Sequence, residues 1–420
     1  MQIIELSKEQ FDNFAINHVN HNFYQTSQYG TLMSRHGFLD LYIGLLDDNH
    51  NIVATSLILS QKKFGRLKYG YAPRGFLIDY SDTNLLTTFT KLLREYLFRL
   101  GFVCVKIDPP ILHIERDNKG NPIPTGINNE GLVMFLKKLN YEHKGFNLYF
   151  ENLKPRWNAV TKLEFPSEKV FKGFSKQMRN KIRKSYKRGV TIYKGTKDDL
   201  KLFYSFVSKK HTRKLNYYLD CYEIFSKNDM FELFFAKMNP SVYVRTSKML
   251  YEKELERNNE LVELVKQNTN TALKNKYISK KMHSDKMLTI YKKDVATATN
   301  LFRTYPKGVV IATSAIIKYN KEIFFLIDGY DPKFKSFCAN HLMKWAIINE
   351  YSRKDYLYAH HNAITGNFNK GNPYYGLYEF KRGFNSKVVE YIGEFDMIVN
   401  KQAYYAKEQI KMFKRFFNLK

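Results

Sequence analysis

Two polar residues stand close to the ends of apolar, strand-like segments, and both could take part in acid–base or anion-binding chemistry. Asp108 follows the apolar run of FVCVKIDPP, whose two prolines stop a strand. A carboxylate at the carboxyl end of a sheet strand lies where α/β proteins commonly build their sites, although an Asp before Pro is equally typical of a turn cap. Arg74, in APRGF, could clamp a phosphate or carboxylate, or serve as a structural ion-pair partner.

A strongly basic helix is predicted just before Gly189, which ends it. Apolar residues recur every four positions and predict one buried stripe, made of Phe174, Met178, Ile182 and Tyr186. The other faces carry cations suited to an acidic partner, namely Lys176, Arg179, Lys181, Arg183, Lys184, Lys187 and Arg188. A solvated surface helix is the alternative, because a basic run alone is weak evidence for binding.

The composition favours a polyanionic partner. The chain of 420 residues has 68 Lys and Arg against 40 Asp and Glu, a formal net charge of +28. An excess of this size attracts RNA, DNA or an anionic membrane surface. Hydrophobic residues make up 44% and aromatic residues 16% of the chain, which excludes a disordered protein and, at this length, predicts two or three domains.

The cysteines and the N-terminal sequence indicate the cellular compartment in which the protein is expected. Cys104, Cys221 and Cys338 lie far apart in apolar surroundings, which argues against a disulfide framework or a metal site and favours a reducing compartment. We recognise neither a secretory signal nor an apolar run of ~18 residues. We therefore expect a cytoplasmic protein without a bound metal, with the inner face of a membrane as a further candidate surface.

A repeated pattern surrounds the candidate residues. Before the basic helix and again near the C-terminus, the chain predicts two strands, a helix and another strand, and the first strand of each copy contains ATS. This order describes a mixed sheet with helices packed on it, so the simplest account is a duplicated α/β unit. The strands of the two copies lie in IVATSLILS, YGYAPRGFLIDY and FVCVKIDPP, and in VVIATSAIIKY, EIFFLIDGYD and DYLYAHH.

A long helical insertion is predicted in the second copy. Residues 241–305 contain no Gly and no Pro, and Pro240 and Pro306 bracket them. Residues spaced by three and four predict two antiparallel helices that turn near residues 275–278. The polar residues Asn258 and Thr269 favour a hairpin arm over a dimerisation zipper. The predicted seams are Leu255, Asn258, Val262, Val265, Thr269 and Ala272, and Leu288, Tyr291, Val295, Ala298 and Phe302.

Five segments in register resemble one known family. They are YAPRGFLIDY, VKIDPP, KIRKSYKRGV, LYEFKRGFN and YIGEFDMIVNKQAYY. In this order they are similar to the Fem-type (FemABX) peptidyltransferases, which use aminoacyl-tRNA to build the interpeptide bridge of bacterial peptidoglycan. The resemblance implies an α/β fold with two tandem GNAT-like (acetyltransferase-like) domains and an antiparallel helical-hairpin coiled-coil arm inserted in the second. It implies no cofactor or metal, with aminoacyl-tRNA as co-substrate.

The expected domain bounds follow from the duplication and the insertion. The first GNAT-like domain is expected over residues 1–155, and the second over residues 156–245 and 306–400. The arm is expected over residues 246–305, and a C-terminal helix over residues 401–420.

The resemblance also assigns roles to residues. Lys381, in LYEFKRGFN, matches the family lysine associated with catalysis, and a fixed ammonium beside a developing oxyanion is a sensible role. Phe380 would shape that pocket, and the alternative is a surface Lys beside a buried Phe. Asp108 corresponds to an acidic residue of the substrate cleft, where it could orient or deprotonate the acceptor amine. The partner of the basic helix would be tRNA, with further candidate contacts from Lys280, Lys281, Lys292 and Lys293.

Departures from the family bear on the acceptor. Relatives that use a soluble uridine-diphosphate precursor carry a Lys where this chain has Met33, with Arg35 nearby, and an Arg and a Tyr four residues apart where it reads YLDCYEIF. We take Arg35, Arg74 and Tyr222 as candidate substrate-binding residues. The altered ligands favour a lipid-linked precursor. His360 and His361 replace a Gly pair and are expected to pack or face solvent.

The leading hypothesis is the transfer of Gly, Ala or Ser from aminoacyl-tRNA to the stem-peptide amine of a peptidoglycan precursor. An acyl-CoA N-acetyltransferase is less favoured, because we find no Gly-rich loop for the cofactor's pyrophosphate. A non-catalytic RNA-binding protein with the same fold is the third hypothesis. One sequence does not specify the amino acid or the oligomeric state.

Overall fold

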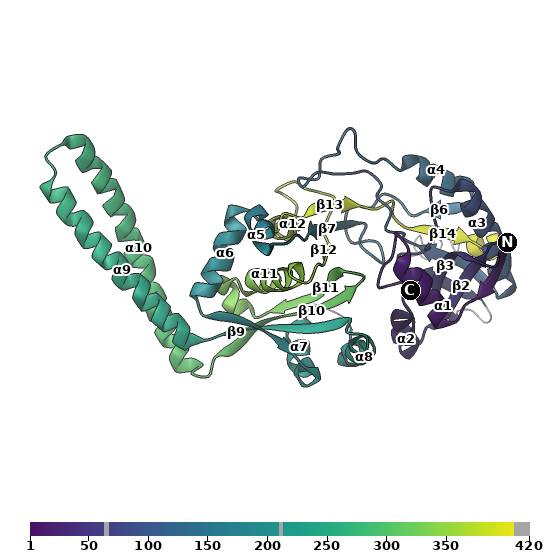
Figure 1. Cartoon of the computed structure of the whole chain (residues 1–420), viewed down its shortest axis with the longest axis horizontal. Coiled ribbons are helices and arrows are strands. Elements are labelled where there is room, and N and C mark those ends of the chain that lie inside the picture. Colours follow the sequence, from purple (N-terminus) through teal and green to yellow (C-terminus); the bar gives the residue numbers. More distant parts are fainter. Residues whose placement is uncertain (63–66, 210–212, 407–420) are drawn as a thin grey trace, which may run out of the picture.

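Two seven-stranded mixed sheets form the body of the protein (Figure 1). The computed structural model describes residues 1–62, 67–209 and 213–406. The first sheet has the order β1 (Gln2–Glu5), β2 (Leu39–Leu46), β3 (Ile52–Lys62), β4 (Lys68–Ala72), β5 (Phe102–Ile107), β14 (Phe395–Ile398) and β6 (Tyr141–His143). The second has the order β13 (Lys387–Glu390), β7 (Trp157–Lys162), β12 (Tyr358–Ala363), β11 (Glu322–Tyr330), β10 (Val309–Tyr319), β9 (Phe231–Met238) and β8 (Val190–Gly195).

The predicted duplication is confirmed by strand pairing. In the first sheet β3 pairs antiparallel with β4, and β4 pairs parallel with β5 after the helix α3 (Thr83–Arg99). In the second sheet β10 pairs antiparallel with β11, and β11 pairs parallel with β12 after the helix α11 (Ala339–Ser352). The two-domain α/β fold is therefore as the sequence predicted.

Amphipathic helices cover the sheets. Asp82 begins α3 because its carboxylate accepts the backbone N–H of Leu85, and the apolar side of α3 packs into the core of the first sheet. The helices of the first domain are α1 (Lys8–Asn17), α2 (Ser27–Arg35), α3 (Thr83–Arg99) and α4 (Glu130–Lys138). Those of the second are α5 (Ser167–Gly173), α6 (Lys176–Lys187), α7 (Leu200–Val207), α8 (Leu215–Ser226), α11 (Ala339–Ser352) and α12 (Tyr375–Arg382), with 3₁₀ turns η1 (Lys197–Asp199) and η2 (Pro332–Phe337).

The last strand departs from the predicted bounds. We expected the second domain to extend to residue 400, but β14 pairs with β5 and β6 of the first sheet. Phe395 and Met397 are buried in the core of the first domain, which explains why the chain returns there. Residues 401–406 are helical, and the remainder of the predicted C-terminal helix lies outside the described residues.

The two domains share a hydrophobic cluster. Side chains from α1, α2 and β3 pack in one cluster with side chains from α7, α8, β9 and β11. Phe23 of the first domain contacts Phe324 of the second, with ring centroids 5.0 Å apart. Arg35 on α2 adds ion pairs to Asp220 at 2.8 Å and Glu223 at 3.1 Å on α8.

The arm is a hairpin of two long helices between β9 and β10, α9 (Pro240–Gln267) and α10 (Thr271–Thr304), and it projects from the body (Figure 1). The predicted turn at residues 275–278 is wrong. The helices are joined at residues 268–270, because Asn270 caps α10 by accepting two backbone N–H groups.

The inner face of the arm is more polar than the predicted seam. Leu255 and Phe302 are exposed, whereas Glu254 and Asn258 are buried. Ser284 donates to Glu254 at 2.7 Å, and Asn258 donates to Asp285 at 2.9 Å. These interhelical hydrogen bonds fit a hairpin that stays within one chain.

The basic helix α6 has the predicted buried stripe except at its end. Met178 and Ile182 are buried, but Tyr186 is 54% exposed and Ser185 is buried in its place. A repeat of four residues drifts around a helix of 3.6 residues per turn, so the stripe moves off the core after two steps. Gly189 ends the helix at φ +73°, and a Cβ there would lie 2.4 Å from the Asn239 carbonyl oxygen.

One cation of this helix anchors the arm. Arg188 donates to Asp294 of α10 at 2.8 Å and to the Ser336 carbonyl at 2.9 Å. Tyr243 of α9 donates to the same Asp294 oxygen at 2.8 Å, and the Arg188 guanidinium lies over its ring. We call Arg188, Tyr243 and Asp294 the arm clamp. Because its charge is engaged there, Arg188 is better explained as a structural residue than as the predicted tRNA contact.

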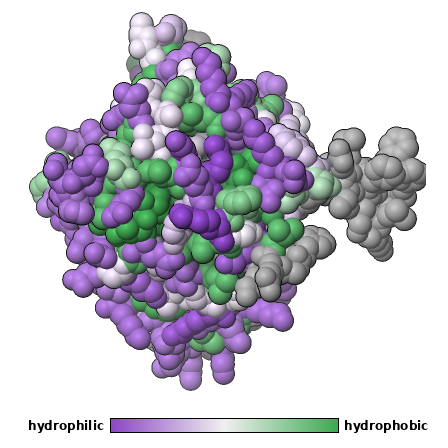
Figure 2. Space-filling model, turned by 90° about the vertical axis from the view of Figure 1, so that its right-hand side faces the viewer, coloured by the Kyte–Doolittle hydropathy of each residue, from purple (hydrophilic) through white to green (hydrophobic). Residues whose placement is uncertain are grey.

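Hydrophilic and apolar side chains alternate on the surface of the first domain (Figure 2). Figure 2 shows the end of the molecule formed by the first domain, where apolar side chains gather in patches between polar ones. In the part of the chain that the structure describes, each helix is too short or too polar to cross a membrane.

The arm clamp predicts a stability effect. Asp294→Ala should lower the free energy of unfolding by about 2 kcal/mol, because two hydrogen bonds to a carboxylate are lost. Urea unfolding measures this difference. Glu252→Ala, at an exposed position on α9, is the control, and equal effects of both substitutions would contradict the clamp.

Candidate active site

A cavity in the second domain opens where two parallel strands separate. β11 and β12 pair only over Glu322–Phe324 and Tyr358–His360, although β11 continues to Tyr330 and β12 to Ala363. Beyond the paired part lies a cavity of about 650 Å³, which we call the lysine cavity. It is lined by residues of α6, β11, η2, α11, β12 and α12, including Lys181, Asp328, His341, Phe380 and Lys381.

Lys381 lies buried in the wall of this cavity, with 7% of its surface exposed. It stands in the last turn of α12, and its Nζ donates to the Ala363 carbonyl at the end of β12, 2.5 Å away. Burial and the nearby charge of Lys344 lower the pKa of Lys381 to about 7, against the opposing effect of Asp328. A lysine whose pKa lies near 7 can exchange a proton at physiological pH.

Phe380 also lines the lysine cavity, as the sequence predicted for a residue that shapes the pocket. Its ring packs edge-on against Phe384, with centroids 5.4 Å apart, and against His341 at 4.9 Å. These contacts fix the wall beside Lys381.

The histidines of this region are held by packing. His361 is buried, hydrogen-bonded to Thr161 at 2.9 Å and stacked on Phe325. Burial lowers its pKa well below the usual value, and burial likewise lowers the pKa of His341 to about 4. His360 hydrogen-bonds Glu322 at 2.9 Å. Among the described residues, we find no cluster of His, Cys, Asp and Glu that could hold a metal ion.

Asp108 and Arg74 form a second buried group, in the first domain. Asp108 is 2% exposed and accepts the Arg74 backbone N–H at 2.6 Å and the Tyr71 hydroxyl at 3.0 Å. Burial raises the pKa of Asp108, and the Arg74 guanidinium only partly offsets this. The guanidinium donates to the carbonyl groups of Asp108 at 3.3 Å and Pro155 at 2.8 Å, so Arg74 also holds the interdomain linker in place.

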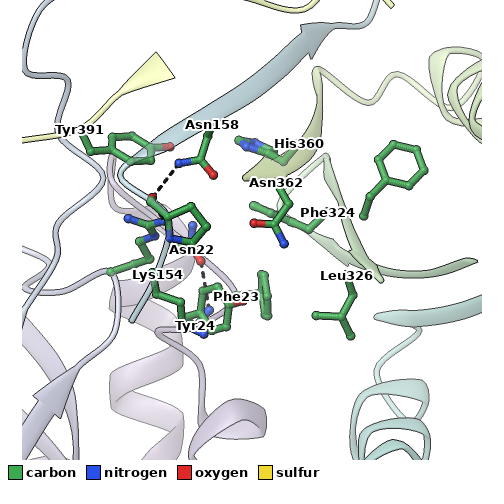
Figure 3. Close-up of a pocket in the computed structure, with 13 residues that line it drawn as sticks. Asn22, Phe23, Tyr24, Lys154, Asn158, Phe324, Leu326, His360, Asn362 and Tyr391 are labelled. Atoms are coloured by element: carbon green, nitrogen blue, oxygen red, sulfur yellow. Dashed lines mark hydrogen bonds between the residues drawn. The ribbon is translucent and has the colours of Figure 1, made fainter. Parts of the chain in front are cut away.

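A small cavity of about 40 Å³ lies beside this group, between the domains. Figure 3 shows Lys154 and Tyr24 from the first domain on one side, and Asn362 and Leu326 from the second on the other. We call it the linker cavity. Arg74 is part of its lining.

An aromatic cavity of about 290 Å³ adjoins it. Lys154 lies with its Nζ 3.6 Å from the centre of the Tyr24 ring, and Arg213 stacks 3.9 Å from the centre of the Tyr217 ring. Both cations line this cavity. Asn362 and Leu326 line all three cavities, which therefore lie next to one another between Arg74 and Lys381.

Comparisons with known proteins agree with this geometry. The model of the FemAB family matches residues 6–412. The chain belongs to the FemAB family. It is 26% identical over 414 residues to aminoacyltransferase FemB of Staphylococcus epidermidis, covering 96% of this chain and 97% of FemB. It is 24% identical over 434 residues to lipid II:glycine glycyltransferase of Staphylococcus haemolyticus, covering 98% of this chain and 96% of that protein.

A solved structure shows the same fold. The crystal structure of FemX aligns with a TM-score of 0.74 at 19% identity, over 97% of this chain and 99% of FemX. The family, the two-domain fold and the enzyme class predicted from sequence are thereby confirmed. This FemAB protein is an aminoacyltransferase.

Two residues of the FemAB protein that were predicted to bind substrate, Arg35 and Tyr222, do not line the three cavities. Arg35 is held by carboxylates of α8. Tyr222 packs against the shared hydrophobic cluster, with its ring 5.9 Å from that of Phe231. Sequence reasoning placed both next to the substrate because they lie at or near positions of phosphate ligands in relatives. Their helices, α2 and α8, line the aromatic cavity through other residues, Tyr29 and Tyr218.

The predicted cations of α6 and its C-terminal end fall into three groups. Arg179 donates to the carbonyl oxygens of Lys172 and Phe174, and Arg188 belongs to the arm clamp. Lys181 lines the lysine cavity. The exposed cations are Lys176, Arg183, Lys184 and Lys187.

Several site residues were missed by sequence reasoning. Lys344 and Asp328 are charged residues inside the apolar segments NHLMKWAII and FFLIDGY, and this interruption is a signal that could have revealed them. Lys154 and Arg213 lie in connecting segments, where we see no pattern that would have indicated them.

The low pKa of Lys381 predicts a pH-dependent stability effect. Unfolded Lys381 keeps its proton up to about pH 10, whereas the folded group loses it near pH 7. Folding therefore disfavours the charged form, and the stability of the wild type rises between these values as pH rises. Lys381→Met should be more stable than wild type below pH 7, with a difference that shrinks towards pH 10. Thermal unfolding across this range tests it, and a difference independent of pH would contradict it.

Proposed function

We propose that this FemAB protein transfers an amino acid from aminoacyl-tRNA to the stem-peptide amine of a lipid-linked peptidoglycan precursor. The supporting observation is the set of three adjoining cavities. Their lining includes Lys381, whose pKa lies near 7, Lys181 of the basic helix, and Arg74, whose backbone N–H donates to the buried carboxylate of Asp108. Relatives are named aminoacyltransferase FemB and lipid II:glycine glycyltransferase, which supports an amino acid as donor group and a lipid-linked acceptor.

The reaction needs no cofactor, because the aminoacyl ester is already activated. A neutral amine attacks the ester carbonyl, and the ribose oxygen leaves. The protein must deprotonate the incoming ammonium, stabilise the charge on the carbonyl oxygen and align two large anionic substrates. Lys381 would act at the reacting groups, and Asp108 would orient the acceptor amine.

We assign the donor to the lysine cavity. Its wall includes Lys181 of α6, whose exposed cations continue outwards across the surface from Lys176 to Lys187. A charged helix beside the cavity can hold the sugar-phosphate backbone without reading bases. The acceptor would enter from the side of the aromatic cavity, where Lys154 and Arg213 supply positive charge for its phosphates. Gly, Ala or Ser would be the group transferred.

A transfer assay tests this function. Purified protein is mixed with tRNA carrying labelled amino acids and with lipid-linked or soluble muramyl-pentapeptide, and the products are read by mass spectrometry. We expect a mass increase of one or more residues on the lipid-linked acceptor. Acetylation from acetyl-CoA without aminoacyl transfer would instead support the acetyltransferase alternative, and tRNA binding without any transfer would support the RNA-binding one.

Lys381→Ala should lower the transfer rate about 10²–10⁴-fold, the usual contribution of a proton-transferring group. Binding of charged tRNA, measured by filter binding, should stay unchanged. A variant as active as the wild type would show that Lys381 is not the catalytic residue.

The exposed cations of α6 predict a salt-dependent effect. Replacing Arg183, Lys184 and Lys187 with Gln should weaken tRNA binding for all sequences. It should also reduce the slope of log K against log salt by about 2, since each phosphate contact contributes about 0.7–0.9.

A matched control removes the same charge from another surface. Lys91, Lys137 and Lys138 are exposed on α3 and α4 of the first domain. Replacing these three with Gln should leave the salt slope near that of wild type. Equal losses in both triple variants would mean that net charge, and not α6, governs binding.

A further inference from the structure

Two lysines are buried beside the lysine cavity, and they share one carboxylate. Lys344 on α11 is 1% exposed and Lys381 is 7% exposed. Among the described residues that line the cavity, Asp328 is the one acidic side chain. A single negative charge does not neutralise two buried ammonium groups, so one of the two lysines is disfavoured as a cation.

The contacts decide which lysine keeps its charge. The Lys344 Nζ lies 2.8 Å from Asp328 Oδ2 and 3.5 Å from the centre of the Phe325 ring, a favourable place for a cation. Ser314 donates to the other carboxylate oxygen at 2.6 Å. Burial raises the pKa of Asp328, but the charge of Lys344 outweighs it, so the pKa lies below the usual value. Lys381 has a neutral partner, the Ala363 carbonyl.

We propose that the Asp328–Lys344 ion pair takes up the negative charge of this pocket and thereby holds Lys381 as a neutral amine, which accepts the proton of the incoming ammonium group. Lys344 is then a positioning residue that acts through Lys381. This differs from the fixed ammonium expected from sequence. The identity of the proton donor rests on the proposed function, whereas the charge state of Lys381 does not.

The proton transfers balance. Lys381 takes one proton from the acceptor ammonium, and the free amine forms a bond to the ester carbonyl carbon. When the bond from that carbon to the ribose oxygen breaks, Lys381 returns its proton to that oxygen. The second amine proton leaves to water, so the products are an amide, a free ribose hydroxyl and one released proton.

The other titratable groups around Lys381 do not supply a counter-charge. Lys181 and Lys335 are basic, and the pKa values of His341 and His361 are lowered by burial. On α12 itself, Glu379 is paired with Arg382 at 2.6 Å.

Competitive trace labelling of the full chain with acetic anhydride tests this inference without any substrate. Peptide mass spectrometry gives the labelling of Lys381 as a function of pH, because neutral amines react and ammonium groups do not. We expect a half-point near neutral pH in the wild type. In Lys344→Met the half-point should rise by about one pH unit, a tenfold change in the fraction of neutral amine at a given pH. Lys344→Arg keeps the charge and should keep the half-point near that of wild type.

Lys318→Met is the matched control. Lys318 is also a buried, ion-paired lysine of the second domain, 2.7 Å from Asp229 and 3.0 Å from Glu232, but it does not line the lysine cavity. The Lys318→Met substitution should leave the labelling half-point of Lys381 unchanged. A half-point near pH 10 in the wild type would overturn the inference. This measurement uses the wild type alone and does not depend on whether a variant folds.

The transfer reaction gives a second readout. In the wild type, kcat should rise with pH around the same half-point, and in Lys344→Met this rise should move to higher pH with it. An unshifted half-point in folded Lys344→Met would overturn the role of Lys344. If labelling shows that Lys381 is neutral but no aminoacyl transfer is detected, the result would support the inference and count against the proposed function.

Discussion

The hydrophobic cluster shared by the two domains is the contact on which the candidate site depends. Burial of apolar side chains from both domains in one cluster resists a hinge motion, because separation would expose all of them to water. Along this boundary Phe23 of the first domain packs against Phe324 of the second, and Tyr24 and Leu326 line the linker cavity from either side. The cavities that reach Arg74 and Lys381 are therefore held in register by packing.

Burial also sets the chemistry of the site. It raises the pKa of Asp108 and lowers that of Lys381, so the environments move an acid and a base towards neutrality from opposite sides. Both pKa shifts come mainly from desolvation. The charges of Arg74 and Lys154 oppose the shift of Asp108, and the charge of Asp328 opposes that of Lys381. Such groups lower stability in the charged state, which is typical of sites kept for function.

Much of the fold could be predicted from sequence, because alternating apolar strands and the repeated strand order are local signals. The pairing of β14 with the first sheet could not, since it joins residues almost 300 positions apart without a local pattern. At the site, the positions of Asp108 and Lys381 were indicated by motif and strand end. The contacts of Arg35 and Arg188 were not, because a cation on a helix does not reveal which neighbouring element supplies a carboxylate. The packing of Tyr222 against the shared cluster was not indicated either.

The two copies of the α/β unit carry different chemistry at corresponding strand ends. In the first, Asp108 follows β5 and accepts the backbone N–H of Arg74, which follows its parallel partner β4. In the second, the carbonyl at the end of β12 accepts Lys381, and Asp328 lies on its parallel partner β11. One copy thus presents a carboxylate and the other an amine. Because the shared cluster holds the two strand ends beside adjoining cavities, a second copy supplies a group that one unit alone does not contain.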